Sequence, residues 1–384
     1  MTTLVVQPDE LAVIQTKQAT DLNWRTCSSS AVDEGLHLWR QLHSRIDNQA
    51  IATHPSWIKS WINHYGDLVS YRFLIAETDG IVRGIALMTD GVGKKNGPFP
   101  VRSLHLGTAG EPQVGSVCVE YNRLLVEPNY EPQFIEGLAH TITNNPTWEE
   151  FCLDGIDEAE LTPWLSQFSN ASVRHRDSKY FDFSEARDGQ GEILPLLGKS
   201  TRSNIRRRLK KYGELKTTWA TKVSEAEEIF ADLVKLHQAR WNAVGEAGAF
   251  ANSRFLSFQK QLLNRLVNEK KVILFRVQHE EQTVGALMLL VDQNRMLDYL
   301  SGFADFSEKP SIGLITHYLC MEEGLKRGFD AYDFLVGEKQ HKDNLSTHKN
   351  QLCWLSYSRP SMKNSTMKTL RKVKHFMGTT SLFS

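Results

Sequence analysis

The hydrophobic positions of residues 31–90 predict two amphipathic helices followed by a β-hairpin. Apolar residues recur at helical spacing over residues 31–46, and again over residues 55–65, which open with proline and stop before glycine. Two apolar runs then flank Asp79-Gly80, a pair that readily adopts the positive φ of a tight hairpin turn. We therefore expect a helix–helix–hairpin unit near the start of the chain.

The same order of helix and hairpin returns about halfway along the chain. A constant shift of 201 positions aligns Gly84 with Gly285 and Trp57 with Phe258. A period this long indicates a duplicated domain, because solenoid repeats are about 20 to 50 residues long. Chance similarity between two amphipathic units is the competing explanation.

The remaining periodicity predicts a mixed α/β (α+β) fold. Strands are expected at 101–107, 115–126, 149–153, 171–183, 271–303, 331–335 and 351–358, and helices at 130–144, 158–168, 200–213, 225–243, 253–268 and 312–327. The glycine-containing stretch 186–192 has no apolar period and is the expected linker. We divide the chain into domains of residues 1–188 and 189–384.

Composition excludes several classes of protein. The 384 residues are 41% hydrophobic, and 45 Lys and Arg balance 45 Asp and Glu, so no net charge favours nucleic acid or an anionic membrane. The sequence has no run of about 18 apolar residues and no secretory leader pattern, so we expect a cytoplasmic protein without a transmembrane segment. Five scattered cysteines fit neither a disulfide framework nor a zinc site; Cys118, Cys152, Cys320 and Cys353 have apolar neighbours and are expected to be buried thiols. No metal is expected.

A basic helix is predicted at residues 199–211. It carries seven Lys or Arg residues within thirteen positions, among them Arg202 and Arg206. Such a helix would bind a phosphorylated group, such as a coenzyme phosphate or a tRNA backbone. A solvated helix between domains explains the charge equally well.

Three further segments bring together groups that suit a site. His237, Arg240 and Trp241 share one end of a predicted helix beside a glycine-containing loop, as in a substrate pocket, although a helical histidine is more often structural.

Pro310-Ser311-Ile312-Gly313 opens another helix, whose first N–H groups suit a pyrophosphate. Serine is also a common helix cap, so this motif is weak by itself.

The last of the three segments lies just beyond a predicted strand end. Asp333, Glu338, His341 and Lys342 gather there. Ligands of open parallel sheets bind at strand ends of this kind. A salt-bridged loop is the alternative.

In this order, the segments resemble the GNAT-like acyltransferases related to the Fem peptidoglycan aminoacyltransferases, in the subgroup found in exopolysaccharide and cellulose biosynthesis. The residues that carry the resemblance are LGKSTRSNIRRRLKKYG, LHQARW, DYLSGFADFSEKPSIG and YDFLVGE with Lys342. The family usually has Tyr-Lys where this chain has His341-Lys342.

The resemblance implies two tandem GNAT-like domains, the first degenerate and the second catalytic. It implies transfer of an acyl group from acetyl-coenzyme A or another acyl-coenzyme A to an amine or hydroxyl of a sugar, a sugar nucleotide or a related glycan precursor. Aminoacyl-tRNA is a less favoured donor. A non-catalytic scaffold of polysaccharide synthesis is the alternative outside the enzymes.

The resemblance also suggests roles for the candidate residues. Acyl transfer needs a base, donors for the oxyanion and an acid for the leaving thiolate. Asp333 or Glu338 would be the base, Tyr299 the acid, and the backbone around Ser301 and Gly302 would polarise the thioester. Lys342 or Arg240 would hold an anionic substrate. The acceptor, the acyl length and the oligomeric state are left open.

Overall fold

A computed structural model describes residues 22–47, 50–96, 99–145, 147–189 and 191–360. The helices are α1 (Val32–His43), α2 (Pro55–Tyr65), α3 (Glu131–Asn144), α4 (Thr162–Gln167), α5 (Phe183–Asp188), α6 (Lys199–Tyr212), α7 (Val223–Ala243), α8 (Ser253–Leu266), α9 (Ile312–Lys326) and α10 (Gln340–Leu345). The strands are β1 (Asn23–Ser28), β2 (Tyr71–Thr78), β3 (Ile81–Asp90), β4 (Lys95–Asn96), β5 (Phe99–Pro100), β6 (Ser103–Leu106), β7 (Leu125–Val126), β8 (Glu150–Asp157), β9 (Ser172–Asp182), β10 (Lys216–Trp219), β11 (Val272–His279), β12 (Gln282–Asp292), β13 (Arg295–Phe303), β14 (Ala331–Val336) and β15 (His348–Ser358).

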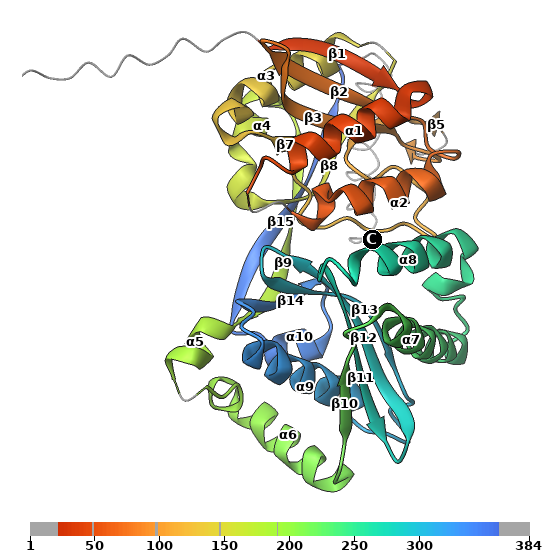
Figure 1. Ribbon diagram of the computed structural model, residues 1–384, viewed down its shortest axis with the longest axis vertical. Helices are drawn as coiled ribbons and strands as arrows, with labels where there is room; N and C mark the ends of the chain where they lie inside the picture. Colours follow the sequence, from red (N-terminus) through yellow and green to blue (C-terminus); the bar gives the residue numbers. More distant parts are fainter. Residues whose placement is uncertain (1–21, 48–49, 97–98, 146, 190, 361–384) are drawn as a thin grey trace, which may run out of the picture.

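One 13-stranded mixed sheet runs through both halves of the chain (Figure 1). Its order is β1-β2-β3-β6-β8-β15-β9-β14-β13-β12-β11-β10, with β7 added to β3. Each half has antiparallel strands followed by one parallel pair, which is β6–β8 in the first half and β13–β14 in the second. The expected mixed α/β fold is therefore confirmed.

The two halves repeat one another in register as well as in order. The β2–β3 hairpin has a bulge between Ala76 and Glu77, and the β11–β12 hairpin has one between Val277 and Gln278. These positions differ by 201 residues, as do Gly84 and Gly285. A Cβ on Gly84 would lie 2.4 Å from Phe134 of α3, and one on Gly285 would lie 2.1 Å from Thr316 of α9. The aligned glycines thus let one helix approach the hairpin closely in each half.

The last strand of each half pairs with the sheet of the other half. β9 follows β8 in the chain but pairs with β14, whereas β15 follows β14 and pairs with β8. β9 and β15 also pair with each other along nine residue pairs, from His348↔Tyr180 to Ser356↔Ser172. Figure 1 shows both strands running between the upper and lower bodies. The exchange joins the two halves through backbone hydrogen bonds.

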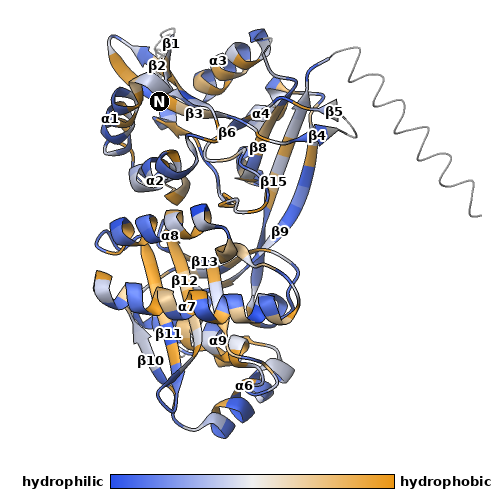
Figure 2. Ribbon diagram, turned by 90° about the vertical axis from the view of Figure 1, so that its right-hand side faces the viewer, coloured by the Kyte–Doolittle hydropathy of each residue, from blue (hydrophilic) through white to orange (hydrophobic). Residues whose placement is uncertain are grey.

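Helices cover the sheet and enclose its apolar strands. Figure 2 shows hydrophobic residues concentrated on β11, β12 and β13, where α7 and α8 lie against them. The apolar residues of α2 and α8 belong to the same core cluster, so one hydrophobic core extends across the junction of the halves. Among the described residues, no helix combines the length and apolar character needed to cross a membrane.

The expected strand at 115–126 is wrong over most of its length. Residues 107–124 form a loop, and only Leu125–Val126 pair as β7. We call residues 107–124 the crossing loop. Gly107, Gly110, Gly115, Cys118 and Tyr121 all have positive φ there, which a regular strand does not allow. In the second half, the equivalent place in the sheet is a bulge at Tyr299 of β13, between Asp298 and Leu300. The crossing loop takes the place of that bulge in the first half, because β3 pairs with β6 before the loop and with β7 after it.

The cysteines are free thiols, and one expectation about them needs correction. Cys27, Cys152, Cys320 and Cys353 are buried, whereas Cys118 is exposed. The residues on either side of Cys118 are apolar, but the crossing loop turns these neighbours inward and leaves Cys118 exposed.

Candidate functional site

The parallel strands β13 and β14 separate after a short run of pairs. Their register runs from Arg295↔Ala331 to Leu297↔Asp333 and ends there. Beyond this point β13 continues along β12, whereas Leu335 of β14 takes a positive φ of 56°. The segments 299–313 and 333–342, which hold most of the predicted site residues, therefore begin on either side of this separation.

Lys342 holds the end of β14 in its turned conformation. Its ammonium donates hydrogen bonds to the carbonyls of Phe334 (2.5 Å), Leu335 (2.9 Å) and Val336 (3.1 Å). Burial lowers the pKa of Lys342. Three carbonyls around one cation stabilise the unusual backbone of Leu335. The predicted catalytic lysine is thus at the strand separation, with its N–H donors directed at the backbone.

Two stacked imidazoles lie beside the separated strands. The rings of His317 and His341 are 4.8 Å apart at an angle of 10°, and His317 also contacts Phe303 of β13 and Phe334 of β14. Burial lowers the pKa of each imidazole to about 3. Both are therefore neutral near pH 7. Where the resembled family usually has tyrosine, this chain has His341, whose neutral ring packs against His317.

Two groups of potential metal ligands lie in the described part of the chain. The ligand atoms of Asp298, His317 and His341 lie within 4.8 Å of one another, as do those of Glu158, His175 and Cys353. These are the two groups of three such residues that could surround an ion. The expectation of no metal stays a prediction.

Asp333 is buried and receives four hydrogen bonds. Tyr121 donates its hydroxyl at 2.6 Å, Ser178 donates at 2.7 Å and the Leu335 N–H donates at 2.7 Å. Arg295 completes the set with an ion pair. These donors come from the crossing loop, β9, β14 and β13, so Asp333 ties both halves together at the strand separation. Its role as a base stays a prediction.

Glu120 is a half-buried carboxyl at the same place that the sequence analysis missed. It comes from the crossing loop, and its Oε2 accepts the Val336 N–H at 2.9 Å. Burial raises the pKa of Glu120 to about 7, against the opposing effect of the Val336 N–H and of Lys342. Glu120 lies in a stretch predicted to be a strand, and no local signal in the sequence marks it. Predicted Glu338, by contrast, is exposed.

Tyr299 lies between the halves. Its hydroxyl donates to the Val117 carbonyl at 3.0 Å and accepts from Gln259 Nε2 at 2.8 Å. Burial raises its pKa well above the ordinary value. A small cavity of 20 Å³ separates Tyr299 from Glu120 and is also lined by Trp57, Leu297 and Leu335. The predicted acid and the newly found carboxyl thus face one cavity.

The start of α9 faces the basic helix α6 across an open groove. The groove has a volume of 740 Å³ and is lined by Lys199, Ser200, Ser203, Asn204, Arg207, Arg208 and Ser311. Ser311, at the N-cap of α9, has a positive φ of 63°. Ile312 is buried in the core, and Gly313 lies against Phe303.

The predicted phosphate-binding arginines of α6 lie elsewhere on the helix. Arg202 donates to the Pro195 carbonyl at 2.8 Å, and neither Arg202 nor Arg206 lines the groove. Arg207 and Arg208 line the groove instead, on the face of α6 turned toward Ser311. The sequence does not show this difference, because several basic positions flank the apolar face of α6.

The predicted substrate residues lie together at the end of α7. The Nδ1–H of His237 donates to the Ser301 carbonyl at 3.1 Å, and its ring packs near Trp241. Arg240 stacks on Phe306, and Trp241 is 40% exposed. Gly302 leaves space for α7, since a Cβ there would lie 2.5 Å from the Leu233 carbonyl. Ser301 and Gly302 thus connect this surface to β13.

Comparisons with known proteins agree with this architecture. Residues 199–343 match the sequence model of the acetyltransferase (GNAT) domain. FemX is similar in structure, with a TM-score of 0.54 and 13% identity over 85% of this chain and 95% of FemX. L-PGS from Bacillus licheniformis is similar with a TM-score of 0.52 and 12% identity, over 88% of this chain and 96% of that protein. No curated protein sequence matches the chain significantly. The domain match supports an acyltransferase, and the structural similarities show a shared fold.

Proposed function

We propose that this protein, whose residues 199–343 match an acetyltransferase (GNAT) domain, transfers an acyl group from an acyl-coenzyme A to an amine or hydroxyl of a sugar, sugar nucleotide or related cell-envelope polysaccharide precursor. The observation that carries the proposal is the position of the half-buried Glu120, whose carboxyl accepts the Val336 N–H where β13 and β14 separate and whose pKa of about 7 suits a general base.

The groove between α6 and α9 supports binding of the donor's phosphates. Arg207, Arg208 and Lys199 line it beside the N-terminus of a 15-residue helix. A helix N-terminus attracts phosphate through its free N–H groups and its dipole, and arginines add charge-assisted hydrogen bonds. The thioester would then extend along β13 toward Tyr299.

The described residues can supply the proton transfers of the reaction. Glu120 would take the proton of the attacking amine or hydroxyl as the new C–N or C–O bond forms. The C–S bond then breaks, and Tyr299, whose pKa burial raises, would return a proton to the thiolate. Lys342 shapes the backbone around the reacting carbonyl by holding the end of β14.

Isothermal titration calorimetry with acetyl-coenzyme A tests donor binding. We expect Arg207→Ala combined with Arg208→Ala to weaken binding at least about 10-fold, because two charge-assisted contacts are lost. Lys210→Ala combined with Lys211→Ala removes the same charge from the same helix outside the groove and should bind as the parent does. Absence of binding by the unaltered protein to acetyl-coenzyme A and longer acyl-coenzymes would favour a scaffold instead.

Transfer from aminoacyl-tRNA is the second candidate. The basic residues of α6 and the structural similarity to FemX and L-PGS favour it. Because phosphate contacts release counterions, tRNA affinity would fall steeply with salt concentration. A filter-binding titration with bulk tRNA from 50 to about 200 mM salt separates this candidate from the first.

A further inference from the structure

The first half contains its own cavity at the position equivalent to the β13–β14 separation. The parallel pairing of β6 with β8 ends at His105↔Cys152, and a cavity of 570 Å³ opens there. Strands β6 and β8, the crossing loop, β9 and β15 contribute to its wall, which includes Ser103, His105 and Asp154. The proposed acyltransferase chemistry uses none of these three residues.

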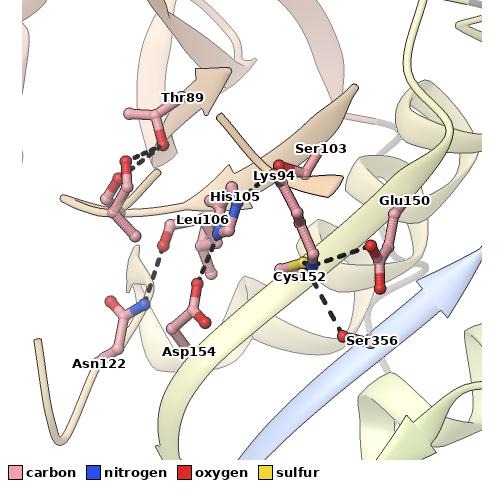
Figure 3. A network of polar contacts seen from close by, with 12 residues as sticks. Thr89, Lys94, Ser103, His105, Leu106, Asn122, Glu150, Cys152, Asp154 and Ser356 are labelled. Carbon is pink, nitrogen blue, oxygen red and sulfur yellow. Dashed lines mark hydrogen bonds and ion pairs between the residues drawn. The ribbon is translucent and has the colours of Figure 1, made fainter. Parts of the chain in front are cut away.

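Ser103, His105 and Asp154 form a continuous hydrogen-bonded series (Figure 3). His105 Nδ1 lies 2.7 Å from Asp154 Oδ2, and His105 Nε2 lies 3.0 Å from Ser103 Oγ. An ionised carboxylate only accepts hydrogen bonds, so Nδ1 carries the ring proton of a neutral His105. Nε2 then has a free lone pair, and the Ser103 hydroxyl donates to it. This is the tautomer in which an imidazole can take a proton from a serine.

The strands fix these three side chains rigidly. Ser103 and His105 are two residues apart on β6, so their side chains lie on the same face of the strand. Asp154 projects from β8 two residues beyond Cys152, which forms the last β6–β8 pair with His105. Gly91 leaves the space beside them, since a Cβ at that position would lie 2.1 Å from Ser103 Oγ and 2.7 Å from His105 Nε2. Ser103 is 2% exposed, so a reactant reaches it only from within the cavity.

The wall of the same cavity carries charges of both signs, with Lys94, Arg174 and Arg176 beside Glu111, Glu120 and Asp154, and this suits a polar substrate. Lys94 lines it and is held by Glu150 at 2.8 Å and by Cys152 at 3.3 Å (Figure 3). Arg174 and Arg176 lie across the ring of Trp354 at the cavity wall. The cavity thus combines a serine hydrogen-bonded to an imidazole with a polar wall that carries both signs of charge.

We propose that this cavity is a second acyl-transfer site, at which Ser103 is the nucleophile toward an ester or thioester of a small polar acyl compound. Ser103 Oγ bonds to the acyl carbon while its proton passes to His105 Nε2, and Asp154 stabilises the imidazolium. The C–O or C–S bond breaks, and the leaving group takes the proton from Nε2. Water then attacks the acyl-serine, its proton passes through His105 to Ser103, and a carboxylic acid is released.

Labelling with a small alkyl fluorophosphonate, followed by peptide mass spectrometry, tests the nucleophile. We expect a single phosphonylated residue, Ser103, and no labelling in Ser103→Ala. Ser116 lines the same cavity but contacts Glu111 rather than an imidazole, so Ser116→Ala is the matched control and should label at the parent's rate. An unlabelled Ser103 in folded protein, or labelling at Ser116 instead, overturns the proposal.

The role of the imidazole is tested separately, with p-nitrophenyl acetate as the ester. Asp154→Asn and His105→Gln should each lower the hydrolysis rate about 100-fold or more, with the folded state checked by circular dichroism. Because Asp154 is partly exposed, Asp154→Asn disturbs the fold less than a change of His105, and it tests the mechanism if His105→Gln fails to fold. A rate unchanged in Asp154→Asn contradicts the mechanism. Acetyl-coenzyme A titration of Ser103→Ala should match the parent, which keeps this result independent of the donor site.

Discussion

The indole of Trp57 and the ring of Phe258 meet edge to face, with centroids 5.3 Å apart and an interplanar angle of 90°. These residues occupy equivalent positions of the internal repeat, on α2 and α8. Each half therefore presents the same helix face to the other, and the two faces pack together about an approximate two-fold axis. Trp57 also contacts Tyr299, so this packing borders the proposed acyl site.

Phe258→Ala is expected to lower the free energy of unfolding by about 3 to 5 kcal/mol, because it leaves a cavity at the junction of the halves. Urea denaturation measures this loss. Phe306→Ala, at an exposed aromatic ring, should cost less than about 1 kcal/mol. A double-mutant cycle with Trp57→Ala should give a coupling of about 1 kcal/mol. Strict additivity would contradict the direct ring contact.

Asp333→Asn separates a structural from a catalytic role. As an anchor, Asp333 balances the buried Arg295, and its neutral isostere should cost about 3 to 5 kcal/mol of stability. If Asp333 is instead the base, Asp333→Asn would fold with the parental stability and lose turnover. Chemical denaturation and coenzyme A release measured on the same preparation decide between them. We expect the loss of stability.

Lys342→Met removes the ammonium that three carbonyls share. The carbonyls would be buried without a donor, so we expect a loss of about 3 kcal/mol or more in urea denaturation. Lys339→Met, three residues earlier and exposed, removes an equal charge and should change stability little. Equal effects of the two variants would show that charge alone matters.

Glu120 predicts a specific dependence on pH. The unfolded carboxyl ionises near its ordinary pKa of 4.5, whereas the folded one keeps its proton until a pH of about 7. Stability should therefore fall by about 3 kcal/mol as the pH rises through this window, since the unfolded state loses its proton first. Glu120→Gln should remove that dependence. A parental slope in the variant would assign the effect to another group.

The same carboxyl governs the expected rate profile. Transfer measured by release of coenzyme A, with a set of amino sugars as acceptors, should rise with pH to half its maximum near 7 as Glu120 ionises. Glu120→Gln should reduce the rate about 100-fold or more. A rate that is retained and still rises near pH 7 would exclude Glu120 as the base.

Local periodicity in the sequence determined most helices, the two hairpins and the duplication, because a 3.6-residue or two-residue apolar period reports burial within one element. It also placed Asp333 and Lys342 near one strand end, since they follow one another closely in the chain. The sequence did not show which arginines of α6 face the groove, because several basic positions flank the apolar face of this helix.

Only the tertiary structure decided the exchange of β9 and β15, the path of the crossing loop and the position of Glu120 against Val336. Each depends on contacts between residues far apart in the sequence, and such contacts leave no period in the chain. A carboxyl acquires a raised pKa from the surroundings that desolvate it, and those surroundings exist only once both halves have packed together.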